Sequence, residues 1–131
     1  MQILSLDHVA FNVSDPERSL AFYVGTLGLE PLRVEEYRAG TAQFPSVRIN
    51  EQTIINLFPP EMHQAQPGGQ SVNHIALLLA DPPPVIEAFF RERGFPIVNE
   101  MTGNFGARGD NAHSFYVKDP DGNLIEFHSY E

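Results

Sequence analysis

A short stretch of this chain occurs twice. Residues 6–11 read Leu-Asp-His-Val-Ala-Phe, and residues 72–77 read Val-Asn-His-Ile-Ala-Leu. His8 therefore matches His74 at an offset of 66 residues (74 − 8 = 66). Two further pairs share this offset, Asp15 with Asp81 and Gly28 with Gly94. A repeat of this length is one supersecondary unit present in two copies. The chain is therefore expected to fold as two similar units, each beginning with a strand that carries a histidine.

The hydrophobic pattern predicts the same order of elements, βαβββ, in both copies. In the first copy we expect a strand over 3–13, a helix over about 15–27 that Gly28 ends, and strands over 30–37, 42–49 and 53–58. In the second copy we expect a strand over 72–80, a helix capped by Asp81 and running to Arg93, and strands over 96–101, 112–118 and 123–129. The Gly- and Asn-rich stretch 102–111 is expected to be a substrate loop.

The length of 131 residues fits a single domain, residues 1–131. We expect it to consist of modules 1–58 and 72–131, joined by the proline- and glycine-rich linker 59–71. A curved sheet with a helix on its outer face leaves its inner face uncovered, so two units must pair to enclose a sheltered space. The predicted fold class is α+β, with the two βαβββ modules in tandem forming a curved, partly open barrel.

Composition narrows the classes of partner. The formal net charge is −9, with 17 acidic and 8 basic side chains, so nucleic acid is an unfavourable partner. The absence of cysteine excludes disulfides and thiolate metal sites. No segment approaches ~18 continuous apolar residues, and no basic stretch precedes an apolar run at the N-terminus. These features predict a cytoplasmic protein that does not associate with membranes.

Strand alternation predicts which side chains face the sheltered space. In each predicted strand one apolar row suits packing under the helix, and the other row then points inward. This rule places His8, His74 and Glu126 on the same inner surface. Tyr116 and His128 are expected to face inward as well.

Two imidazoles and one carboxylate on rigid strands form a facial triad that leaves positions open for water, substrate or dioxygen. We therefore expect one divalent metal ion at His8, His74 and Glu126, with Fe(II) or Mn(II) favoured and Ni(II), Co(II) or Zn(II) as alternatives. A lone histidine on a strand is usually a polar residue without such a role. The repeated position and the inward glutamate together favour the metal site.

Five segments carry a resemblance to a known family. They are Asp7-His8-Val9, residues 19–23 (Ser-Leu-Ala-Phe-Tyr), Leu27-Gly28-Leu29, Asn73-His74-Ile75, and residues 115–126, which run from Phe115 through Asp119-Pro120-Asp121-Gly122 to Glu126. With these segments the whole chain resembles the vicinal oxygen chelate superfamily, which includes glyoxalases, extradiol dioxygenases, fosfomycin-resistance transferases and bleomycin-resistance proteins. Its overall pattern is similar to that of small glyoxalase-domain proteins.

The resemblance implies a metal-dependent enzyme whose small substrate chelates the ion through neighbouring oxygens. The implied chemistry is of the dioxygenase, lyase or isomerase, or transferase type, with Tyr116 as a catalytic hydrogen-bond donor or general acid. By analogy, a homodimer would combine His8 of one subunit with His74 and Glu126 of the other, although a site within one chain stays open. The alternative is a ligand-sequestering binding protein of the bleomycin-resistance type, without catalysis.

Some positions depart from the family pattern. The internal repeat aligns Asn56 with Glu126, and glyoxalase I enzymes carry a carboxylate at the position of Asn56. Extradiol dioxygenases carry an acid/base histidine at the position of Ala107, beside Arg108. Arg48 alternates with apolar neighbours and is a candidate substrate anchor. The candidate substrate-binding residues are thus Asn56, Arg48, Arg108 and His128.

Overall fold

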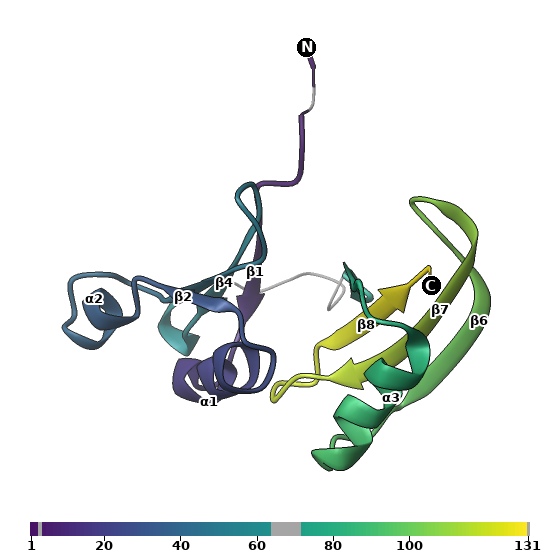
Figure 1. Ribbon diagram of the computed structural model, residues 1–131. Coiled ribbons are helices and arrows are strands. Elements are labelled where there is room, and N and C mark those ends of the chain that lie inside the picture. The colour runs from purple at the N-terminus through teal and green to yellow at the C-terminus, as the bar shows by residue number, and fades with distance from the viewer. Residues whose placement is uncertain (3, 64–71, 131) are drawn as a thin grey trace. The chain divides into compact units, whose positions relative to one another are not determined.

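The computed structural model describes residues 1–2, 4–63 and 72–130. The chain divides into two compact units, Met1–Pro67 and Gly68–Glu131. Each unit contains one four-stranded sheet (Figure 1). Most of the predicted linker, residues 64–71, lies outside the described residues, and Pro60–Met62 within its first part form a 3-10 turn, η2.

The first unit contains β1 (His8–Asn12), α1 (Pro16–Leu20), its π-helical continuation η1 (Ala21–Thr26), β2 (Glu30–Leu32), α2 (Val34–Arg38), β3 (Ser46–Arg48) and β4 (Ile54–Phe58). The strand order in its sheet is β1-β4-β3-β2. β1 pairs with β4 in parallel, and the other pairs are antiparallel.

The second unit contains β5 (Ile75–Leu78), α3 (Pro83–Glu92), β6 (Asn99–Gly106), β7 (Gly109–Lys118) and β8 (Leu124–Ser129). Its strand order, β5-β8-β7-β6, with β5 parallel to β8, repeats the topology of the first unit. The predicted duplication and the α+β class are therefore confirmed.

Each unit has its own core between helix and sheet. In the second unit, α3 contributes the buried Ile86 and Phe90, and β8 contributes Ile125 and Phe127. The rings of Phe90 and Phe127 lie 4.5 Å apart, and α3 lies against one face of the sheet (Figure 1). These side chains follow the predicted alternation, so the opposite face of β8 is the one that carries Glu126 and His128.

The repeated glycines end equivalent helices. Gly28 follows η1 with φ 77°, and Gly94 follows α3 with φ 74°. Both φ values lie in the left-handed region, which glycine adopts without a Cβ clash. The sequence prediction of these helix ends is confirmed.

Two predicted elements are wrong in detail. The strand expected over 30–37 ends at Leu32, because Arg33 has a left-handed backbone (φ 59°) and the chain then forms α2. Asp81 does not cap α3; Pro82 is the N-cap, without a side-chain hydrogen bond. The backbone oxygen of Asp81 instead accepts a hydrogen bond from the Ser129 hydroxyl at 2.8 Å.

The stretch 102–111 is a β-hairpin and not a loop. β6 and β7 continue through it to a turn at Ala107 and Arg108, with Gly106 pairing Gly109. The register shifts twice along β6, around Asn104, next to Gly103 with its left-handed backbone (φ 66°). Glycines and asparagines that signalled a loop therefore accommodate β-bulges in a long hairpin.

In the described part of the chain, no helix is long and apolar enough to cross a membrane.

Candidate metal centre

The face of the second sheet opposite α3 carries a set of polar side chains in register. Cross-strand neighbours share a face. Ala76, Glu126, Tyr116 and Asn99 form one such row, and Leu78, His128, Ser114 and Met101 form the next. His74 directly precedes β5, at the end of the strand that pairs with β8.

Glu126 lies at the centre of this face and is only 5% exposed. Its Oε1 accepts hydrogen bonds from the Tyr116 hydroxyl at 2.9 Å and from Asn104 Nδ2 at 2.9 Å, and lies 3.2 Å from His128 Nδ1. Its Oε2 lies 3.3 Å from His74 Nε2. The His74 and Tyr116 rings meet edge to face, with centroids 5.7 Å apart. The second unit thus brings together four residues that the sequence singles out: His74, Tyr116, Glu126 and His128.

The two repeated histidines are oriented in the same way by the residue before each. His8 Nδ1 lies 2.8 Å from Asp7 Oδ2, and His74 Nδ1 lies 2.7 Å from Asn73 Oδ1. Both partners are acceptors, so each Nδ1 carries a proton and each Nε2 points away from this contact. Metal-bound histidines usually have this arrangement, with the second ring nitrogen donating to a carboxylate or carbonyl oxygen.

The first unit presents the equivalent face with different chemistry. His8, Ile54 and Arg48 are cross-strand neighbours in one row, and Ala10, Asn56 and Ser46 form the next. Asn56 is 7% exposed, and its Oδ1 accepts a hydrogen bond from the Ser46 hydroxyl at 2.7 Å. The pair Ser46–Asn56 therefore occupies the register positions that Tyr116–Glu126 occupy in the second unit.

Hydrogen bonding keeps Glu126 charged and Tyr116 neutral. Burial would raise the pKa of Glu126, but hydrogen bonds from Ser114, Tyr116 and His128 outweigh it and lower that pKa below its usual value. Burial, together with the hydrogen bond to Glu126 and its negative charge, raises the pKa of Tyr116 to about 12. At neutral pH the site therefore pairs a carboxylate with a phenol that retains its proton.

Two of the three predicted ligands, His74 and Glu126, are spaced as ligands of one divalent ion would be. Two ligands at right angles on an ion with bonds of about 2.1 Å are about 3 Å apart, close to the 3.3 Å between His74 Nε2 and Glu126 Oε2. The third predicted ligand, His8, belongs to the other unit and is the first residue of β1. In the described residues, no group of three or more histidine, aspartate or glutamate side chains is gathered within one metal-binding cluster.

The remaining candidates lie at turns. Arg48 Nη1 donates to the backbone oxygens of Asn50 and Glu51, at 3.0 and 3.4 Å, in the turn after β3. Arg108 lies at the tip of the β6–β7 hairpin, with its guanidinium carbon 5.6 Å from the centre of the Tyr130 ring. Their predicted contact with a substrate stays a prediction.

Sequence reasoning missed Asn104. Its amide reaches Glu126 and Ser114 only because β6 continues through the stretch that was expected to be a loop. The register partner of Ser114 is Met101, and Asn104 pairs with Ala112, so regular strand pairing gave no signal for this contact.

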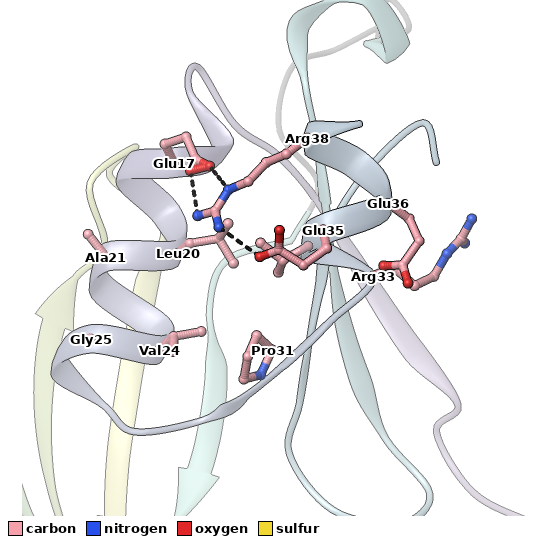
Figure 2. A pocket seen from close by; sticks show the side chains of 11 residues that line it. Glu17, Leu20, Ala21, Val24, Gly25, Pro31, Arg33, Glu35, Glu36 and Arg38 are labelled. Atoms are coloured by element: carbon pink, nitrogen blue, oxygen red, sulfur yellow. Dashed lines mark hydrogen bonds and ion pairs between the residues drawn. The ribbon is translucent and has the colours of Figure 1, made fainter. Parts of the chain in front are cut away.

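A separate groove lies on the helical side of the first unit. It has a volume of about 560 Å³ and is lined mainly by residues of α1, η1 and α2. Figure 2 shows Arg38 reaching across it to Glu17 and Glu35, with Arg38 Nε 2.8 Å from Glu17 Oε1. None of the predicted site residues lines it, so this groove is distinct from the polar faces described above.

Comparisons with known proteins agree with this fold. A family model described as the Glyoxalase/Bleomycin resistance protein/Dioxygenase superfamily matches residues 5–127. The chain is 30% identical over 131 residues to glyoxalase domain-containing protein RDO1 of Mycosarcoma maydis, which covers 100% of this chain and 71% of that protein. It is 29% identical over 126 residues to lactoylglutathione lyase of Salmonella typhimurium, covering 94% and 90% of the two chains. The crystal structure of virulence protein STM3117 from Salmonella typhimurium superimposes with a TM-score of 0.77 and 26% identity, over 100% of both chains.

Proposed function

Because the chain belongs to the glyoxalase/bleomycin resistance protein/dioxygenase superfamily, we propose that it is a metal-dependent enzyme. Its substrate is a small molecule that chelates the ion through neighbouring oxygens. The ligands are His8, His74 and Glu126, and the ion is divalent, with Fe(II) or Mn(II) favoured by the two imidazoles and one carboxylate.

One observation carries the proposal: the contact between His74 Nε2 and Glu126 Oε2 at 3.3 Å. It holds an imidazole nitrogen and a carboxylate oxygen at about the separation that two ligands of one ion require. The matching Nδ1 contacts of His8 and His74 support it, since they leave both Nε2 atoms available for the same ion.

The chemistry follows from these residues. A divalent ion at this site would polarise the substrate oxygens bound to it and stabilise the negative charge that develops on them. Tyr116 donates its single proton to Glu126 in this structure. It would serve as the hydrogen-bond donor or general acid once a substrate oxygen takes the place of that acceptor. Its raised pKa of about 12 makes it a persistent donor at neutral pH.

The presence of an amide at Asn56, in place of a carboxylate, argues against a reaction of the lactoylglutathione lyase type. That reaction, by the family pattern, uses a carboxylate at this position, and the amide of Asn56 cannot abstract a proton. The oxygen of the amide is already engaged by the Ser46 hydroxyl at 2.7 Å. The proposed reaction class is therefore of the dioxygenase, isomerase or transferase type, despite the similarity to a lyase from Salmonella typhimurium.

Metal binding by the purified protein tests the proposal. Wild type is expected to bind one Mn(II) per site in isothermal titration calorimetry, and His8→Ala, His74→Ala and Glu126→Ala are each expected to lose it. His63→Ala is the matched control, because His63 follows η2 and its Nε2 contacts the backbone oxygen of Phe58 at 2.9 Å.

Oxygen uptake with catechols, compared with thiol-transfer, isomerase and lyase assays, then separates the reaction classes. If wild-type protein binds none of Mn(II), Fe(II), Ni(II) and Zn(II), the proposal of a metal-dependent enzyme is contradicted. That result would favour a ligand-sequestering binding protein.

A further inference from the structure

The two oxygens of the Glu126 carboxylate have different surroundings. Oε1 has three polar partners at 2.9, 2.9 and 3.2 Å, Tyr116, Asn104 and His128, and the Ser114 hydroxyl also interacts with the carboxylate. For Oε2 the described polar contact is His74 Nε2 at 3.3 Å. A carboxylate oxygen with three hydrogen bonds has little acceptor capacity left, so the two oxygens are not equivalent as ligands.

Two of the three partners of Oε1, Asn104 and His128, also contact one serine. Asn104 Nδ2 has two hydrogens, and it lies 3.0 Å from Ser114 Oγ and 2.9 Å from Glu126 Oε1. His128 Nδ1 lies 2.8 Å from the same Ser114 Oγ. Ser114 is completely buried, and His128 is 6% exposed. Three strands, β6, β7 and β8, therefore each contribute one residue to a connected group around Oε1.

We infer that Asn104, Ser114 and His128 form a carboxylate clamp that fixes the rotation of the Glu126 side chain. The clamp occupies Oε1 and leaves Oε2 directed at His74, so that Glu126 binds the metal through Oε2 alone. These three are positioning residues, since they act through Glu126. The inference rests on the proposed function, because it concerns how the proposed ligand meets its ion.

The β6–β7 hairpin has a glycine at the position that lies against the His128 ring. A Cβ at Gly106 would overlap His128 Nε2 and the Tyr130 hydroxyl. The same hydroxyl accepts a hydrogen bond from the Arg108 backbone N–H at 2.9 Å, which ties the hairpin turn to the end of the chain. Gly106 thus lets β6 lie directly over His128, which brings Asn104, two residues earlier, to Glu126.

The first unit provides the contrast. Its equivalent of Glu126 is Asn56, which has a single described partner, the Ser46 hydroxyl. The short β3 ends at Arg48, and the strand next to it, β2, has only three residues. The extended β6–β7 hairpin, which supplies Asn104, occurs in the same unit as the Glu126 carboxylate. This supports a role for the hairpin in positioning Glu126.

The affinity for Mn(II) tests the clamp. Asn104→Ala and Ser114→Ala are each expected to weaken Mn(II) binding by about tenfold or more, as loss of hydrogen bonds to a ligand typically does. Asn111→Ala is the control, since Asn111 is an exposed asparagine of the same hairpin. Thermal unfolding of the metal-free variants establishes that they are folded.

A crystal structure of the Mn(II)-bound protein gives a readout that general destabilisation does not alter. We expect a single bond from Glu126, through Oε2, with Asn104 still within hydrogen-bond distance of Oε1. Bidentate binding, or folded Asn104→Ala and Ser114→Ala variants with wild-type affinity, would overturn the clamp and leave the proposed function standing. A wild-type protein that binds no Mn(II) would overturn both.

Discussion

At the scale of single residues, one hydrogen bond in the second unit joins a carboxyl group with a lowered pKa to a phenol with a raised pKa. The hydroxyl of Tyr116 donates to Glu126 at 2.9 Å, and both side chains are more than nine-tenths buried. Burial raises the pKa of Tyr116, and the neighbouring carboxylate raises it further. Burial would also raise the pKa of Glu126, but hydrogen bonds from Ser114, Tyr116 and His128 lower it. The contact therefore remains intact across the physiological pH range.

Titration of the metal-free protein checks this. The difference in tyrosinate absorbance between wild type and Tyr116→Phe is expected to have its midpoint near the pKa of about 12, against an ordinary value of 10.0. Because the folded-state pKa is raised, the stability from this contact is complete below pH about 10 and is lost as pH rises towards about 12.

Glu126→Gln is the control for the titration, since it removes the negative charge while keeping the side chain's size. In that variant the midpoint of Tyr116 should move back towards its ordinary value. An unchanged midpoint would mean that the carboxylate does not control the phenol.

At the scale of elements, the order of the strands and the glycine-terminated ends of the two helices follow from the sequence, whereas the helix α2 and the hairpin over 102–111 do not. The side chains of β8 alternate as predicted because a strand has a period of two residues, which puts Ile125 towards α3 and Glu126 on the opposite face. The pattern around Asn104 failed because glycine and asparagine favour both loops and β-bulges. Local composition cannot distinguish the two, since the difference depends on whether the partner strand continues alongside.

Two glycines near one helix end are expected to respond oppositely to alanine. Gly28 has φ 77°, so Gly28→Ala should destabilise the protein by about 1–2 kcal/mol. Gly25, in η1, has open space at its Cβ position and a backbone outside the left-handed region, so Gly25→Ala should stabilise it by about 0.5–1 kcal/mol. Urea unfolding of both variants measures the difference. Equal effects would contradict a left-handed backbone at Gly28.

At the scale of the whole molecule, the sequence repeat corresponds to two sheets with the same strand order and register. Ser46 faces Asn56 across β3 and β4 as Tyr116 faces Glu126 across β7 and β8. The duplication itself could be predicted from the 66-residue offset, because an equal spacing of strand, helix and glycine requires equal topology. The hydrogen-bonded group around Glu126 could not be predicted in this way, because it depends on register shifts in β6 that the spacing of the repeat does not specify.

A mixed assembly tests how His8 reaches the other ligands. We propose a homodimer with shared sites, so a dimer of one His8→Ala chain and one Glu126→Ala chain should contain one intact site. Purification with two different affinity tags isolates this dimer, and calorimetry with Mn(II) counts its sites. The two parent homodimers serve as controls and should bind none. A mixed dimer without any site would contradict ligands contributed by both chains.

The positions of β1 and β5 in their sheets have a consequence for self-association. Each is an edge strand, paired within its own sheet only to β4 or β8, respectively. An edge strand presents a row of backbone N–H and C=O groups to which a further strand can add. The strand that begins with His8 and the strand that follows His74 are therefore two of the four edges, with β2 and β6, at which a further strand could add to these sheets. If these histidines bind metal as proposed, removal of the metal is expected to increase precipitation of the protein, which light scattering would measure.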